Sequence, residues 1–71
     1  MQYLVIVEKG AKGYGAHVPD LPGCIAAAAT REEVLALSRE AIEFHIEGIR
    51  EQGECVPSPS SVAELVEVSA A

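Results

Sequence analysis

The sequence has few cysteines and no long hydrophobic run, and both absences narrow the kind of protein it encodes. Cys24 and Cys55 are its only cysteines, and they lack the close pairing that a metal site requires. We expect two free thiols that behave as small buried apolar residues, with a disulfide as the less favoured alternative. No basic start precedes an apolar run at the amino terminus, and no run approaches the roughly 20 residues of a membrane span. The sequence therefore predicts a cytoplasmic protein.

Basic residues are also scarce. Five lysines and arginines stand against eleven aspartates and glutamates, which gives a formal net charge of −6. The five cations are dispersed and form no basic stripe, so direct nucleic-acid binding is not expected, because phosphate contacts would lack their cations. An acidic surface suits a basic protein partner, and it is also a common means of staying in solution.

The sequence also lacks a set of acid–base and nucleophilic side chains at the spacing that catalysis requires. Asp20 is the only aspartate, and it stands between two prolines. His17 and His45 are the two candidate acid–base groups, but no serine, cysteine or carboxylate is spaced to complete a catalytic set with either. The glycines at 10, 13 and 15 lack the spacing of a phosphate loop. We predict no cofactor, no metal and no enzymatic activity.

At 71 residues the chain forms one small domain, residues 1–71, with a modest core. Residues 3–8 place apolar side chains on both faces of an extended chain and predict a first strand. The glycines that follow predict a hairpin turn, and residues 14–18 predict a second strand. A third strand at residues 25–29 is ambiguous, since a run of alanines from Ala26 to Ala29 prefers helix by intrinsic propensity. Residues 57–61 form a loop, and residues 62–68 are a plausible final edge strand.

Two prolines and a glycine shape residues 18–24, whose sequence is V-P-D-L-P-G-C. Proline fixes φ and removes a backbone donor, so no regular strand or helix runs through this segment. Gly23 is able to take positive φ at no steric cost. The segment is therefore a short, rigid connector between two elements.

A long amphipathic helix is the clearest element. Thr30 is a good N-cap with Glu33 at the third helical position, which predicts a reciprocal capping box, and Gly53 can end the helix in left-handed geometry. The apolar arc covers on the order of 200°, wider than one packing face needs, so part of it is available for a second surface. That surface is either the carboxy-terminal segment or a second copy of the chain. The residues we assign to self-association are Phe44, Leu37, His45 and Ile46. A buried, hydrogen-bonded role for His45 is the simpler alternative.

The order of these parts resembles the amino-terminal domain of the HicB family of antitoxins. The densest match is the double-proline segment at 18–24, followed by the T-R-E-E helix start at 30–33 and by Gly53 and Pro57-Ser58-Pro59 after the helix. The resemblance implies an α+β fold similar to a reduced ribonuclease H-like fold, with an antiparallel sheet of three or four strands and one long helix. Nuclease chemistry would need converging carboxylates, which the sequence does not supply.

The resemblance also implies a function. Antitoxins of this family bind a small, basic, mRNA-cleaving HicA-like toxin and block it. An acidic surface without catalytic groups is compatible with masking such a partner. The residues we assign to partner binding are Glu40, Glu43, Glu47 and Glu51 on the helix, with Asp20 and His17 as weaker candidates.

One departure from the family pattern affects the expected role. Members usually carry a carboxy-terminal DNA-binding domain, and no recognition helix follows the last candidate strand here, so we expect a standalone domain. The alternative function is a homo-oligomeric scaffold or small binding module with no toxin partner.

Overall fold

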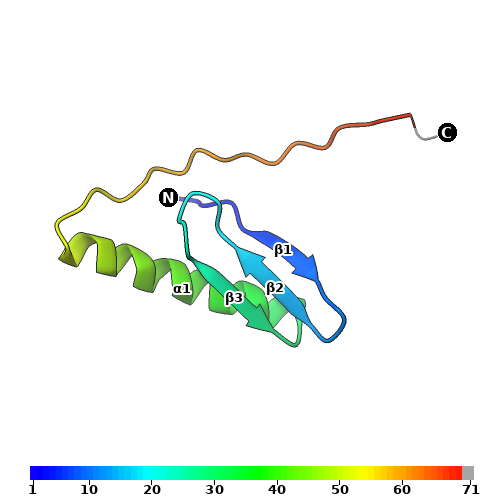
Figure 1. The fold of residues 1–71 in the computed structure, drawn as a ribbon, viewed down its shortest axis with the longest axis horizontal. Coiled ribbons are helices and arrows are strands. Elements are labelled where there is room, and N and C mark those ends of the chain that lie inside the picture. Colours follow the sequence, from blue (N-terminus) through cyan, green and yellow to red (C-terminus); the bar gives the residue numbers. More distant parts are fainter. Residues whose placement is uncertain (70–71) are drawn as a thin grey trace.

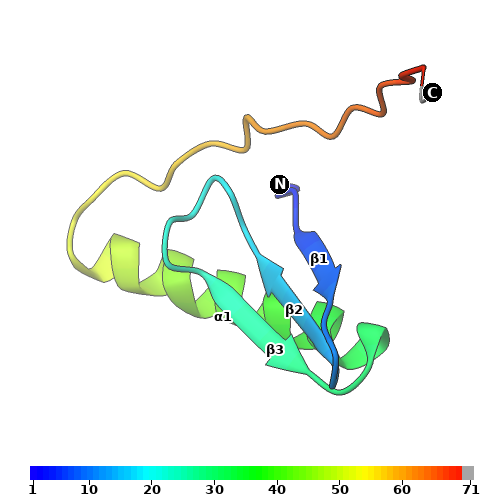
Figure 2. The ribbon, with the colours of Figure 1, turned by 45° about the vertical axis from the view of Figure 1, so that its right-hand side comes forward.

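The computed structural model, described over residues 1–69, contains a three-stranded sheet and one long helix. The strands are β1 (Ile6–Lys9), β2 (Tyr14–His17) and β3 (Ile25–Ala28), and the helix is α1 (Arg31–Glu51). The sheet is antiparallel with strand order β1-β2-β3, and α1 lies across one of its faces (Figures 1 and 2). The predicted α+β class is confirmed, and so is the strand assignment of the alanine-rich segment.

A tight hairpin joins β1 to β2. The Gly10 amide donates to the Gly13 carbonyl oxygen at 2.7 Å, and Lys9 pairs with Tyr14 across the ladder. Gly13 is required for space, because a Cβ atom there would lie 2.6 Å from the carbonyl oxygen of Ala28. This close approach sets the end of β3 against the hairpin. The first strand begins at Ile6, later than the predicted residue 3, although Tyr3 and Val5 still pack against the core.

The double-proline connector consists of two consecutive turns. The Leu21 amide donates to the Val18 carbonyl oxygen at 3.0 Å, and the Cys24 amide donates to that of Leu21 at 3.0 Å. Each turn therefore has proline at its second position, where a fixed φ is favoured. Gly23 takes a φ of +85° at the third position of the second turn, as a type II turn requires. The two turns direct Leu21 inward, where it is fully buried.

Residues that flank α1 cap both of its ends by hydrogen bonds. The Thr30 hydroxyl oxygen accepts from the Glu33 amide at 3.1 Å and donates to the Glu33 carboxylate at 3.0 Å. The Glu33 side chain thus bonds the hydroxyl of Thr30 and not its amide, a variation on the predicted capping box. At the other end Gly53 has a φ of +74° and donates to Arg50, while Glu54 donates to Ile49, which makes a Schellman motif.

The core lies between the connector and the helix. Val18, Leu21 and Cys24 form its centre. Half-buried side chains from the amino-terminal segment and from α1 surround them: Tyr3, Val5, Ala41, Ile42, Ile46 and Ile49. Ser38 is buried on the helix, and its hydroxyl donates to the Val34 carbonyl oxygen at 2.7 Å, so no polar group is left unsatisfied there. The connector therefore contributes most of the buried centre in addition to linking β2 to β3.

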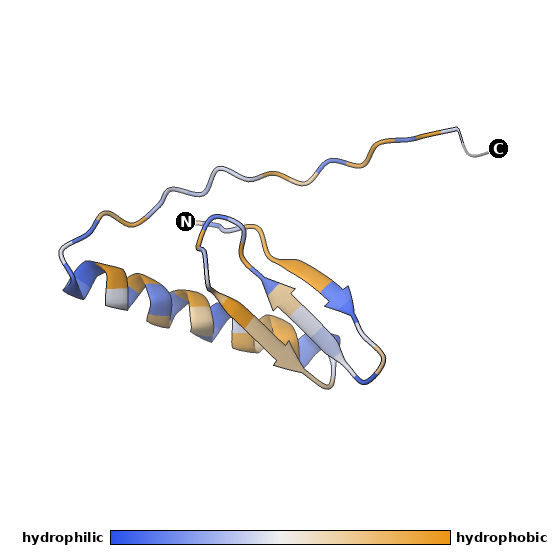
Figure 3. Cartoon of the chain, in the orientation of Figure 1, coloured by the Kyte–Doolittle hydropathy of each residue, from blue (hydrophilic) through white to orange (hydrophobic). Residues whose placement is uncertain are grey.

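The chain after α1 runs as an extended segment that crosses the molecule beside the amino terminus (Figure 1). The predicted final strand at residues 62–68 is wrong, because residues 62–69, here called the C-terminal arm, pair with no strand of the described chain. The arm diverges from β1 and lies away from β3, so neither free edge of the sheet is beside it (Figures 1 and 2). Its large apolar side chains are exposed, and the cartoon in Figure 3 is coloured orange, for hydrophobic residues, along parts of the arm.

Candidate partner-binding site

The four glutamates assigned to partner binding lie on the solvent side of α1. Glu40, Glu43, Glu47 and Glu51 recur at three- and four-residue spacing, and all four are exposed. Glu43 forms an exposed ion pair with Arg39 at 3.4 Å, the one salt bridge found in residues 1–69. A shallow hollow beside them is lined by Glu43, Ile46, Glu47, Arg50 and Glu51. The helix therefore presents an acidic surface with an apolar patch at Ile46.

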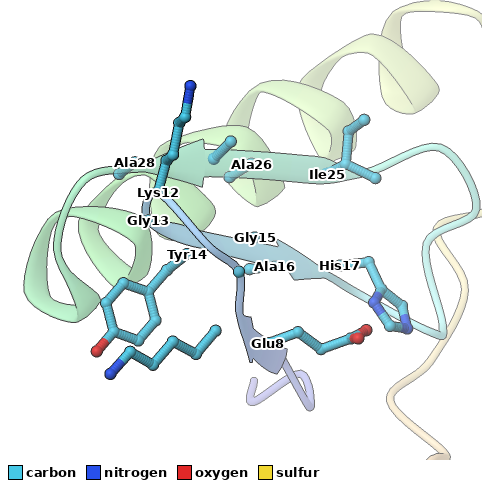
Figure 4. Close-up of a pocket in the computed structure, with 13 residues that line it drawn as sticks. Glu8, Lys12, Gly13, Tyr14, Gly15, Ala16, His17, Ile25, Ala26 and Ala28 are labelled. Atoms are coloured by element: carbon cyan, nitrogen blue, oxygen red, sulfur yellow. The ribbon is translucent and has the colours of Figure 1, made fainter.

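A second hollow lies over the sheet face that α1 does not cover (Figure 4). Pairing places Gly15 opposite Ala27 and His17 between Ile6 and Ile25 on that face. Gly15 leaves it open, since a Cβ atom added there would meet nothing within 4 Å. Glu8 extends along the sheet toward His17 in Figure 4. His17 thus belongs to an open, mixed apolar and charged surface, separate from the helix glutamates.

Asp20 has a partner within the chain. Its two carboxylate oxygens accept four hydrogen bonds, from the amides of Ser60 and Ser61 at 2.9 Å each and from their hydroxyls at 3.1 and 2.8 Å. These bonds, led by the Ser61 amide, lower the pKa of Asp20 from 3.8 to about 2. The carboxylate is therefore a clamp that fixes the start of the C-terminal arm. Sequence reasoning missed Ser60 and Ser61, because nothing in the sequence links positions 40 residues apart.

The four residues assigned to self-association divide into two pairs. Phe44 and Leu37 are exposed, Phe44 by 74% of its surface. Ile46 packs against the domain's own core, and His45 is half-buried at the edge of a hollow that Phe44 and Gly48 also line. The wide apolar arc of the helix thus covers the core with one part and leaves Phe44 and Leu37 in solvent with another.

The two cysteines have different environments. Cys24 is buried, and burial raises the pKa of its thiol. Cys55 is exposed, so its predicted burial is wrong; it follows the helix-ending glycine, in a segment that leaves the core. Both are free thiols, as predicted. Within residues 1–69, no cluster of three histidine, cysteine, aspartate or glutamate side chains is placed to hold a metal ion.

The helix of the described chain is not apolar enough over its length to span a membrane.

Comparison with known proteins connects this architecture to a family. A family model described as HicB-like antitoxin of a bacterial toxin–antitoxin system matches residues 3–70. The chain belongs to the HicB-like antitoxin family. A UPF0150 protein of Thermoplasma acidophilum is 40% identical over 58 residues, which cover 80% of this chain and 84% of that protein.

Two further relatives of this HicB-like chain are longer. A 14.9 kDa protein of Haemophilus phage HP1 is 39% identical over 66 residues, covering 93% of this chain and 50% of the phage protein. Antitoxin HicB 2 of Photorhabdus laumondii is 36% identical over 75 residues, covering 99% of this chain and 51% of that antitoxin. The HicB-like chain therefore spans about half the length of these two relatives.

A solved structure supports the same assignment. A chain in the structure of the HicA3 and HicB3 toxin–antitoxin complex superposes with a TM-score of 0.72 at 30% sequence identity. The superposition covers 84% of this HicB-like chain and 70% of the other. The shared arrangement extends through the sheet and helix, the elements that carry both surfaces described above.

Proposed function

We propose that this HicB-like chain is an antitoxin that binds and neutralises a small, basic, mRNA-cleaving HicA-like toxin. The observation that carries the proposal is the likeness to a chain of the HicA3 and HicB3 complex, at 30% identity over most of this chain. That level of similarity, together with the family assignment, supports a partner of the same kind.

The charge of the chain favours such a partner. With a formal net charge of −6, it attracts a basic protein at long range, which speeds encounter and disfavours acidic competitors. The exposed glutamates of α1 concentrate that charge on one surface, and Ile46 lies in the hollow beside them. We assign the toxin-binding surface to this acidic face, with Glu43 and Glu47 at its middle.

The proposed action is binding and not catalysis. Asp20 is engaged with Ser60 and Ser61, and the helix glutamates point into solvent along one face, where they repel one another. Glu8 and His17 lie on the uncovered sheet face, away from the helix glutamates. An antitoxin that covers the RNA-binding surface of its toxin needs none of these groups to react.

The test is a binding titration with a purified HicA-like toxin from the same genome, repeated at rising salt. The double variant Glu43→Lys/Glu47→Lys should weaken binding about tenfold at low salt, since each of the two reversed exposed charges changes the binding free energy by roughly 0.7 kcal/mol. The matched control is Glu54→Lys/Glu64→Lys, which changes the net charge equally but lies outside α1.

Three outcomes are informative. A loss of affinity confined to the helix variant supports the acidic face as the site. An equal loss in both variants attributes the effect to net charge alone and removes the face from the proposal. Absence of binding by the unaltered chain at low salt contradicts the antitoxin function.

The alternative function is a homo-oligomeric scaffold without a toxin, and the exposed apolar side chains of Phe44 and of the C-terminal arm favour it. Purification of the tagged chain from its native host at low salt separates the two. A small basic protein that co-elutes and is lost as salt rises supports the antitoxin. Elution as a homo-oligomer alone supports the scaffold.

A further inference from the structure

We propose that two copies of this chain exchange their C-terminal arms, each arm adding as a fourth strand to the free edge of β3 in the other copy. The proposal concerns self-association and does not depend on the presence of a toxin.

The arm has the properties of a strand without a partner. Val62, Leu65, Val66 and Val68 all expose three quarters or more of their surface, and Leu65 is fully exposed. Side chains alternate in direction along an extended segment, so Val66 and Val68 project to one side and Leu65 to the other. Each side of the arm therefore carries apolar side chains and one glutamate, Glu64 on the side of Val66 and Val68 and Glu67 on the side of Leu65. No described part of its own chain covers the apolar side chains.

The Asp20 clamp keeps the arm from folding back to its own β3. Four hydrogen bonds fix Ser60 and Ser61 beside the connector, and the Tyr3 hydroxyl donates to the Pro57 carbonyl oxygen just before them. From there the arm runs past the amino terminus, on the side of the molecule away from β3 (Figures 1 and 2). A second copy is the available source of a free edge.

The edge of β3 is open and uncharged. In an antiparallel pair, every second residue hydrogen-bonds to the neighbouring strand. Cys24 accepts from the Val18 amide, so Ala26 and Ala28, two and four residues later, also bond to β2. Ile25 and Ala27 then direct their N–H and C=O groups to the free edge. The strand has the sequence I-A-A-A, without the charges or prolines by which free edges are usually protected. At the opposite edge, β1 carries Glu8 and Lys9, which oppose strand addition.

Apolar groups flank the β3 edge on both faces of the sheet. Ile25 exposes 73% of its surface on the face away from α1. On the other face, α1 packs mainly against β3 and β2. Ile42 and Ile46 lie on the flank of α1 that contacts the core together with Tyr3 and Val5. Helical periodicity places Leu37 and Phe44 on the opposite flank of α1, toward β3. On the face away from α1, Leu65 of an added strand would cover Ile25. On the α1 side, Val66 and Val68 of that strand would cover Leu37 and Phe44.

A single edge substitution tests the pairing. Ala27→Pro removes an N–H that points to the free edge and leaves the bonds to β2 intact, whereas Ala27→Thr keeps the N–H. Sedimentation should give twice the 7.5 kDa chain mass for the unaltered protein and for Ala27→Thr, and the single-chain mass for Ala27→Pro. Leu65→Asp/Val66→Asp should also give the single-chain mass, and because these side chains are exposed, the domain keeps its fold.

Disulfide trapping identifies the edge that is used. In a Cys55→Ser background, Leu65→Cys combined with Ile25→Cys should give a covalent dimer on mild oxidation. A dimer from Leu65→Cys alone would show arm-to-arm contact, and one from Leu65→Cys with Lys9→Cys would show pairing at β1; either result as the main product overturns the proposal. A single-chain mass for the unaltered protein at high concentration overturns it as well.

Discussion

The carboxylate of Asp20 accepts both the backbone amide and the hydroxyl of Ser61, at 2.9 and 2.8 Å, across 41 positions of sequence. Asp20 lies in the third position of the first connector turn, between Pro19 and Pro22. The turn fixes its backbone, and this positions the carboxylate that binds Ser61. This contact joins the connector between β2 and β3 to the segment that follows α1. It determines the direction in which the C-terminal arm leaves the domain.

Acid should release the clamp. Folding lowers the pKa of Asp20 from 3.8 to about 2, so its contribution to stability is complete above about pH 4 and is lost as the pH falls toward 2. The amide resonances of Ser60 and Ser61 should therefore titrate with a midpoint near 2, and amide exchange at both should accelerate in Asp20→Asn at neutral pH. A titration midpoint near 3.8 for these amides would show that the carboxylate is not bonded to them in solution.

Gly13 should tolerate no side chain. A Cβ atom there would lie 2.6 Å from the Ala28 carbonyl oxygen, so Gly13→Ala forces the hairpin away from β3 and should cost about 1–3 kcal/mol of unfolding free energy. Gly15→Ala, two residues along, meets nothing within 4 Å and is the matched control. Urea denaturation of both variants measures the difference. Equal midpoints would mean that the hairpin and β3 do not approach this closely.

Leu21 should dominate the core energetically. Leu21→Ala empties a fully buried position between the two connector turns and should cost about 2–5 kcal/mol, a large part of the stability of so small a domain. Leu65→Ala removes the same atoms from a fully exposed position and should leave the urea midpoint unchanged in dilute solution. A small effect at Leu21 would show that the connector is not the centre of the core.

Much of the fold could be predicted from local sequence signals. The capping threonine, the helix-ending glycine and the turn prolines act on neighbouring residues, and each lies in the structure where those signals place it. The alanine-rich strand β3 was predictable only through the family resemblance, because its own propensity favours helix. Pairing with β2 overrides that propensity.

The parts that failed depend on distant contacts. The apolar residues at 62–68 indicate a segment able to pair as a strand, but they do not say whether a free sheet edge lies within reach. The Asp20 clamp directs this segment away from the sheet edges. The same contact engages the carboxylate of Asp20, which we assigned to partner binding, with Ser60 and Ser61 of its own chain. Exposure of Phe44 and Leu37 follows from the width of the helix arc. The packing of the half-buried Ile46 against the core required knowing on which side of the helix the connector lies.

The most direct test of the antitoxin function is an RNA-cleavage assay with a purified HicA-like toxin from the same genome, in which this chain is titrated against the toxin. We predict that cleavage stops near one equivalent of chain at low salt and that Glu43→Lys/Glu47→Lys requires a large excess to do the same. Undiminished cleavage at a large excess of the unaltered chain would contradict the account.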